Sequence, residues 1–279
     1  MPTTPSLKKL NLKLNGYQCS LKISGSGFPL ILLHTWHPYT KHLTASLPPK
    51  KFQIITFDTP GYYSKTLGKL ATNLSDLNLL LKNLLNHLKF AKVDLLGQCL
   101  GGIIALNFAQ QYPKKVRNLI FITPPLICYQ PKVNKALKVI FSVLEKNRLA
   151  QFLASHLVIK RQTLQNLSKF FGGYQGLAEV FATESSLVNQ TDYNPEVFFG
   201  LLSSAFKLDF WETAKKVKSR TLFVSGEKDP LVRNHDLEKL VKSMENASFK
   251  TIPSAKHALV MKQTEALTQT LLPFLSQPT

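Results

Sequence analysis

The chain is short of acidic residues, of cysteine and of long apolar runs, and each shortage narrows what it can be. Its 279 residues include 35 lysines and arginines but only 16 aspartates and glutamates, a formal net charge of +19. Cys19, Cys99 and Cys128 show no paired spacing, so neither a disulfide framework nor a zinc site is indicated. No stretch approaches the ~20 consecutive apolar residues of a membrane span, and residues 1–13 lack the apolar core of a signal peptide. We therefore expect a cytoplasmic protein with no metal and no cofactor.

The excess positive charge is dispersed along the sequence. Lysines occur singly or in pairs such as Lys8-Lys9 and Lys114-Lys115, and they never form a block of five. No nucleic-acid-binding motif accompanies them. We expect a solvated, lysine-rich surface with weak attraction to anionic surfaces or anionic carriers, and no nucleic-acid partner.

Hydrophobic spacing in the N-terminal part indicates strands. Residues 9–23 alternate with period two around Asn15-Gly16, a dipeptide typical of β-hairpin turns. Residues 29–34 and 53–58 are largely apolar runs that each end in a polar residue. Such runs are typical of strands buried on both faces of a parallel sheet.

Further along, helical and strand patterns alternate. Leucines recur at three- and four-residue spacing over 75–90, and strand, helix and strand follow to residue 123. Helical stretches dominate residues 124–210, after which strands and helices alternate again until a last helix that we expect to stop at Pro273. The pattern predicts an α/β fold, a mostly parallel twisted sheet of about eight strands flanked by helices. We expect residues 1–123 and 211–279 to form one core domain and residues 124–210 to form an inserted helical cap.

The most informative motif is Leu-Leu-Gly-Gln-Cys-Leu-Gly-Gly at residues 95–102, between a predicted strand and a predicted helix. It has the G-x-nucleophile-x-G form of a nucleophile elbow, with Cys99 as the nucleophile. A sharp strand-to-helix turn strains the backbone, and Gly97 and Gly101 remove side chains that would collide there. Gly102 lets the helix approach the sheet. The N-terminus of a helix favours negative charge, and therefore the thiolate, which is the reactive form of cysteine.

With this elbow and the order of the features around it, the chain resembles the α/β-hydrolase superfamily over nearly its whole length. The cysteine elbow is similar to those of dienelactone hydrolases and polyhydroxyalkanoate synthases, whereas the rest looks like capped esterases. The resemblance implies the order nucleophile, acid, histidine. Asp229 follows the strand at 221–225 and His257 follows the last strand, so both join Cys99 in the implied triad. Glu227 is the competing acid.

The resemblance also implies an oxyanion hole, which would bind the negative oxygen that forms during acyl transfer. Its backbone N–H donors would be those of Leu100 and, in the loop after His34, Trp36. Thr35 and Tyr63 stand where the family usually has glycine. Three further residues that could line the pocket are His37, Gln98 and Tyr62.

Such a triad implies hydrolysis of a carboxylic ester, lactone or thioester in a small-molecule substrate, through an acyl-enzyme that water resolves. Two alternatives stay open. The chain could be an acyltransferase or synthase that passes the acyl group to a hydroxyl, amine or thiol. It could instead be a catalytically inactive member in which Cys99 is only a small buried residue.

Overall fold

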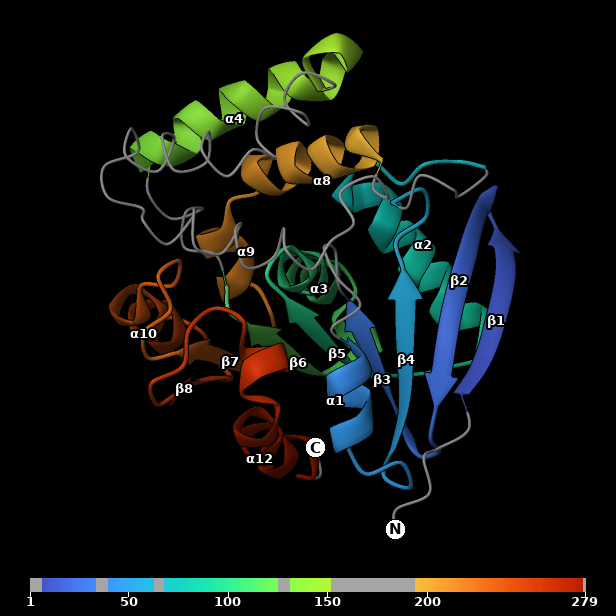
Figure 1. The fold of residues 1–279 in the computed structure, drawn as a ribbon, viewed down its shortest axis with the longest axis vertical. Coiled ribbons are helices and arrows are strands. Elements are labelled where there is room, and N and C mark those ends of the chain that lie inside the picture. The colour runs from blue at the N-terminus through green and yellow to red at the C-terminus, as the bar shows by residue number, and fades with distance from the viewer. Residues whose placement is uncertain (1–6, 34–39, 63–67, 125–130, 152–193, 278–279) are drawn as a thin grey trace.

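The computed structural model of the chain describes residues 7–33, 40–62, 68–124, 131–151 and 194–277 (Figure 1). Eight strands in these ranges form one sheet in the order β1-β2-β4-β3-β5-β6-β7-β8. β1 and β2 pair antiparallel, as do β2 and β4, and every other neighbouring pair is parallel. The predicted α/β class with a mostly parallel sheet is confirmed.

The strands are β1 (Leu7–Leu14), β2 (Tyr17–Ser24), β3 (Phe28–Leu33), β4 (Phe52–Asp58), β5 (Val93–Gln98), β6 (Val116–Ile122), β7 (Arg220–Gly226) and β8 (Ala247–Ile252). The helices are α1 (Thr40–Ser46), α2 (Leu74–His87), α3 (Leu100–Gln111), α4 (Pro131–Lys146), α8 (Pro195–Lys207), α9 (Phe210–Lys215), α10 (Asn234–Lys242), α11 (Leu259–Lys262) and α12 (Thr264–Leu275). A single 3-10 turn, Pro113–Lys115, precedes β6.

The first hairpin forms where the sequence predicts it. Asn15 and Gly16 both adopt positive φ, 52° and 83°, as a two-residue turn of the type I′ class requires. The turn sets the register in which Leu14 faces Tyr17.

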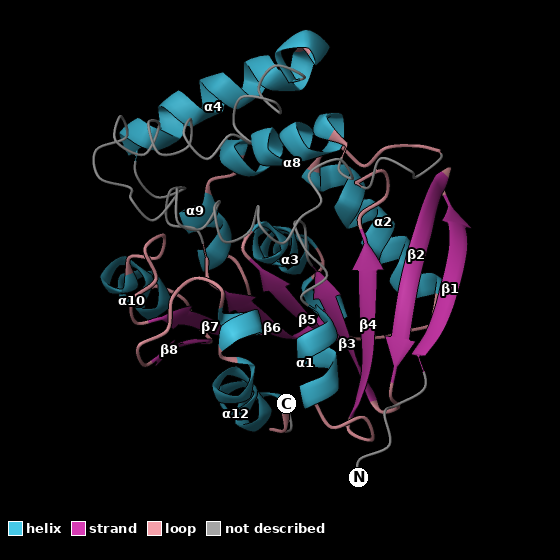
Figure 2. Ribbon diagram, viewed as in Figure 1, coloured by secondary structure: helices cyan, strands magenta, loops and turns pink. Residues whose placement is uncertain are grey.

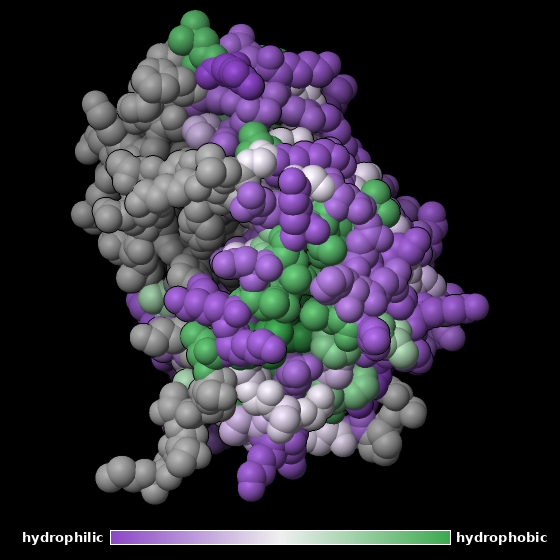
Figure 3. All heavy atoms as spheres, turned by 90° about the vertical axis from the view of Figure 1, so that its right-hand side faces the viewer, coloured by the Kyte–Doolittle hydropathy of each residue, from purple (hydrophilic) through white to green (hydrophobic). Residues whose placement is uncertain are grey.

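Figure 3 shows the side of the molecule that carries β1, β2 and α2, where hydrophilic side chains surround a narrow strip of hydrophobic atoms.

Helices cover both faces of the sheet (Figure 2). In β3, Ile31 belongs to the core against α2 and α3, whereas Leu30 and Leu32 belong to the core against α1 and α12. Both faces of the central parallel strands such as β3, β6 and β7 are buried, which explains why their sequences read as continuous apolar runs rather than as alternating patterns.

The carboxyl ends of the parallel strands meet at one edge of the sheet, and α8 and α4 lie beyond that edge (Figure 1). α8 packs on α2 and α3, and α4 packs on α8. Much of the predicted cap lies outside the described residues, so the division into a core and a cap over 124–210 stays a prediction.

The last helix differs from the prediction, because α12 continues through Pro273 to Leu275. A proline there removes only one backbone hydrogen bond, and it does so in the final turn. Leu271 and Leu275 on either side are buried in the core, and their burial stabilises the extra turn. None of the helices in the described ranges has the length and hydropathy of a membrane span.

Candidate active site

Cys99 lies at the turn between β5 and α3. Its backbone has φ 50° and ψ −119°, a conformation that non-glycine residues rarely adopt. Its N–H donates to the carbonyl of Ile122 in β6 (3.0 Å), and its carbonyl accepts from the N–H of Gly102 (3.0 Å). The strained residue is thus fixed both to the neighbouring strand and to the first turn of α3.

Two glycines let the backbone double back at this turn. A Cβ on Gly97 would lie 2.4 Å from the carbonyl oxygen of Gly101. A Cβ on Gly102 would lie 1.9 Å from the ring of Phe121, which projects from β6. Any side chain at either position would therefore push α3 away from the sheet and displace Cys99.

Asp229 lies in the loop after β7, with its side chain fully buried. Its Oδ1 accepts hydrogen bonds from the backbone N–H groups of Leu231 (2.8 Å) and Val232 (3.2 Å). Nδ1 of His257 lies 2.9 Å from Oδ2 and 3.0 Å from Oδ1. The carboxylate is fixed by its own loop and in turn orients the imidazole.

Backbone contacts join the loop of the acid to the loop of the histidine. The N–H of Glu227 donates to the carbonyl of Ile252 (3.0 Å), and that of Lys228 donates to the carbonyl of Ala255 (2.9 Å). The approach at Gly226 is so close that a Cβ there would lie 2.3 Å from the Ala255 oxygen. These backbone contacts help to hold Asp229 and His257 in register.

His257 is buried, and its two nitrogens have different environments. Nδ1 faces Asp229, whereas Nε2 has no hydrogen bond of ordinary geometry within the described residues. Burial by itself would lower the pKa of the imidazole, but the Asp229 carboxylate and the adjoining Cys99 side chain outweigh it and raise the pKa to about 10. Cys99 therefore lies close enough to His257 to affect its charge.

Residues 27–264 match the α/β hydrolase fold family. The chain belongs to the α/β hydrolase fold family. It is 24% identical to 2-hydroxy-6-oxo-6-phenylhexa-2,4-dienoate hydrolase of Burkholderia cepacia, over 98% of this chain and 97% of that protein. Two solved structures share the fold. A thermophilic esterase from Thermogutta terrifontis has a TM-score of 0.70 and 20% sequence identity, and the match covers 96% of this chain and 98% of that chain. The enol-lactonase from Burkholderia xenovorans has a TM-score of 0.68 and 16% identity, and the match covers 96% of this chain and 100% of that chain. The chain is a hydrolase of the α/β-hydrolase type.

In this α/β hydrolase, the two candidate acids have separate partners. Glu227 is exposed, and its Oε2 accepts a hydrogen bond from the backbone N–H of Ser254 (2.8 Å). Asp229 is the acid that contacts His257. Glu145, the next carboxylate after β6, bonds to Ser203 and Lys207 instead.

The other predicted site residues of the α/β hydrolase are only partly placed. Leu100 is the first residue of α3, where backbone N–H groups have no partner inside the helix. Gln98 is the half-buried last residue of β5, and Tyr62 is buried in the core on the α2 side. The remaining four lie outside the described residues: Thr35, Trp36, His37 and Tyr63.

Two features near the site were missed at the level of sequence. Ser225 Oγ donates to Oδ1 of Asn234 (2.6 Å), and Asn234 Nδ2 donates to the Gly226 carbonyl (3.2 Å), so this pair braces the acid loop. Thr123, just after β6, has φ 48° and a buried hydroxyl with no partner in the described part of the chain. Asn234 begins α10, but nothing in the sequence marks its contact with Ser225 or the strain at Thr123.

No group of three or more histidine, cysteine, aspartate or glutamate side chains in the described ranges is arranged to hold a metal ion.

Proposed function

We propose that this α/β hydrolase cleaves carboxylic ester, lactone or thioester bonds, with Cys99 as nucleophile, His257 as general base and acid, and Asp229 as the orienting carboxylate. One observation carries the proposal. Asp229 holds Nδ1 of His257 at 2.9 Å, while the opposite nitrogen is left without a hydrogen bond beside a cysteine on a strained turn. A purely structural histidine in this position would use both of its nitrogens.

The first half of the reaction transfers the acyl group to sulfur. Because the pKa of His257 is raised to about 10, the imidazole already holds the Cys99 proton at neutral pH, and the sulfur attacks the carbonyl carbon as a thiolate. The carbonyl oxygen becomes negative, and the N–H of Leu100 at the start of α3 would stabilise it, with the N–H of Trp36 as the expected second donor. When the tetrahedral intermediate collapses, the imidazolium protonates the departing alcohol or thiol, leaving a thioester on Cys99.

The second half reverses these roles. His257 takes a proton from a water molecule, whose oxygen attacks the thioester carbonyl carbon. Collapse releases a carboxylic acid and regenerates the Cys99 thiolate beside the protonated imidazole. Because Asp229 and Cys99 raise the pKa of His257 to about 10, the imidazole readily carries the proton that each leaving group needs at neutral pH.

Comparison with relatives guides the choice of substrates. The Burkholderia cepacia relative is named for hydrolysis of 2-hydroxy-6-oxo-6-phenylhexa-2,4-dienoate, and one structural neighbour is an enol-lactonase. A substrate panel therefore includes that dienoate, a lactone, a thioester and 4-nitrophenyl esters of graded chain length.

The test is a burst experiment with 4-nitrophenyl esters. We expect rapid release of one equivalent of nitrophenol, followed by steady turnover, and intact mass spectrometry should show the acyl group on the protein. Cys99→Ala should lower kcat/KM by roughly 10⁴-fold or more. Cys19→Ala, which removes a buried cysteine in β2, is the matched control and should keep the burst.

Each other outcome has a distinct meaning. A burst that stalls until an alcohol or amine is added would identify an acyltransferase. Steady hydrolysis by Cys99→Ala at the wild-type rate would overturn Cys99 as the nucleophile. If no member of the panel is cleaved, acylates Cys99 or is transferred, the chain is an inactive member of the family.

A further inference from the structure

The helix α4, on the far side of α8 from the sheet (Figure 1), is rich in lysine and poor in acidic residues. It carries four lysines and one carboxylate, Glu145. That carboxylate is already neutralised, because its Oε2 lies 2.6 Å from Nζ of Lys207 in α8 and 2.7 Å from Oγ of Ser203. The α4 lysines whose side chains are described, Lys135, Lys138 and Lys146, give this part of the surface a net positive charge.

Three apolar side chains of α4 are exposed. Val139, Ile140 and Val143 are 62%, 44% and 57% exposed. The helix packs on α8 through a different residue, Phe141, whose ring stacks on that of Phe206 with centroids 5.0 Å apart. The exposed residues are therefore not needed for the contact between α4 and α8.

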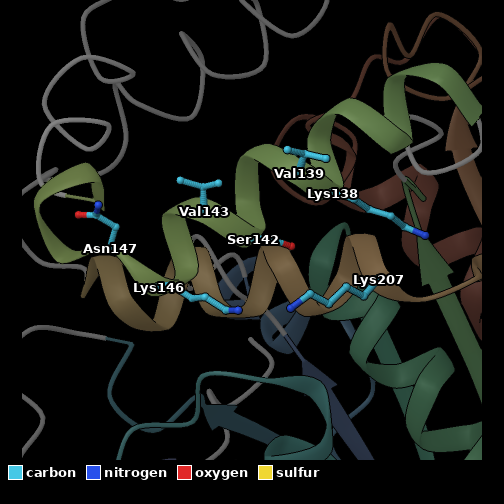
Figure 4. A pocket seen from close by; sticks show the side chains of 7 residues that line it. All are labelled: Lys138, Val139, Ser142, Val143, Lys146, Asn147 and Lys207. Carbon is cyan, nitrogen blue, oxygen red and sulfur yellow. The ribbon is translucent and has the colours of Figure 1, made fainter.

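The lysines lie beside this apolar stripe. Lys138, Lys146 and Lys207 line an open hollow of about 730 Å³ together with Val139 and Val143. Figure 4 shows the lysine side chains extending on the α8 side of α4, while Val139 and Val143 point away from α8. Neither Lys138 nor Lys146 forms an ion pair with another residue in the described part of the chain.

We propose that this face of α4, formed by Lys138, Val139, Ile140, Val143 and Lys146, docks on an anionic lipid bilayer. A helix whose apolar stripe is bordered by lysines suits the headgroup region, where the stripe enters the acyl boundary and the ammonium groups meet lipid phosphates. Nucleic acid would pair with the lysines but leave the apolar stripe in water. A second copy of the chain would bring two lysine-rich faces together, in a protein of net charge +19.

The test is cosedimentation of the full chain with vesicles. Vesicles of equal parts phosphatidylcholine and phosphatidylglycerol should bind it, and vesicles of phosphatidylcholine alone should bind it much less. Each lysine near an anionic surface strengthens binding about fivefold, so Lys138→Gln with Lys146→Gln should weaken it about 25-fold. Val139→Ser with Val143→Ser should weaken it about tenfold.

Matched variants elsewhere serve as controls. Lys8→Gln with Lys9→Gln changes the charge equally on the exposed edge strand β1. Leu79→Ser removes a 49% exposed leucine from α2. Both should bind vesicles as the wild-type chain does. Circular dichroism should show the same helix content and melting temperature in every α4 variant as in the wild-type chain.

Three results of the vesicle assay would overturn the proposal. These are equal binding to both vesicle types, unchanged binding by the α4 variants, or an equal loss in the β1 control. Self-association of the chain that Val139→Ser with Val143→Ser abolishes would also overturn it, in favour of a second copy on this face. The docking does not depend on the chemistry at Cys99: the Cys99→Ala protein should bind vesicles normally, so failure of either proposal leaves the other standing.

Discussion

Strand β5 carries one buried carboxylate, Asp94, and the loop after β7 carries another, Asp229; the two lie at opposite ends of the parallel strands and have different partners. Near the amino end of β5, Asp94 accepts hydrogen bonds from Nε (2.9 Å) and Nη2 (2.6 Å) of Arg117 and from the backbone N–H of Asn118 (3.1 Å). Beyond the carboxyl end of β7, Asp229 faces His257, whose second nitrogen has no hydrogen bond of ordinary geometry within the described residues.

The difference lies in the partner of each carboxylate. Arg117 keeps its proton at all relevant pH values, and its guanidinium stacks 3.5 Å from the Phe28 ring centroid. This ion pair therefore exchanges no proton. Burial raises the pKa of Asp94 even though Arg117 opposes the change. Histidine can both accept and release a proton near neutral pH. Similar buried pairs thus hold strands together at one end of the sheet and, in the proposed mechanism, would transfer protons at the other.

The largest expected effect is on activity, from Asp229→Asn. The amide keeps the shape of the carboxylate but loses the charge that orients and stabilises the imidazolium, so kcat/KM should fall by about 10²–10⁴-fold. Steady-state kinetics on a soluble 4-nitrophenyl ester measure it. A change of less than threefold would remove Asp229 from the mechanism.

The second effect is on stability, from Arg117→Met. It leaves Asp94 buried and unpaired, so the free energy of unfolding should drop by about 3–5 kcal/mol. Urea unfolding measures this, and kcat/KM below the melting transition should stay at the wild-type value. Adding Asp94→Asn should restore part of the loss; no recovery in the double variant would mean that the unpaired charge is not the cause.

The third effect concerns pH. His257 has a pKa raised from 6.5 to about 10 in the folded chain, so its stabilising contribution is complete below pH 6.5 and is lost as the pH rises towards 10. Thermal unfolding should show falling stability over this window, with a smaller fall in Asp229→Asn. Burial raises the pKa of the Cys19 thiol to about 11, which further lowers the stability of both the wild-type chain and Asp229→Asn at alkaline pH. The difference between the two curves therefore isolates His257, and parallel curves would contradict its raised pKa.

The smallest effect is expected from Glu227→Gln. Its side chain is exposed and bonds to the backbone of Ser254 rather than to His257. Activity should change by less than about twofold and stability by less than about 0.5 kcal/mol. A loss comparable to that of Asp229→Asn, measured in the same assay, would reverse the assignment of the acid.

Local sequence was enough to place the elements, and the family resemblance favoured Asp229 as the acid but left Glu227 as a competitor. The hairpin at Asn15-Gly16 and the turn at Cys99 depend on residues that are close together in the chain, so the local sequence predicts both of them. Asp229 and Glu227 are two residues apart in the same loop. Only the contact between Nδ1 of His257 and the Asp229 carboxylate shows which one faces the histidine.

The sequence by itself determined the α/β architecture, since periodic burial leaves its mark on every strand and helix, and it determined the glycine-flanked turn that carries Cys99. Tertiary structure alone decided the partners of each buried charge. Arg117 reaches Asp94 across 23 positions and His257 reaches Asp229 across 28, and pairs so distant leave no local pattern. It also decided which side of α4 stays exposed, because an amphipathic pattern shows that a helix has two faces but not which of them is buried.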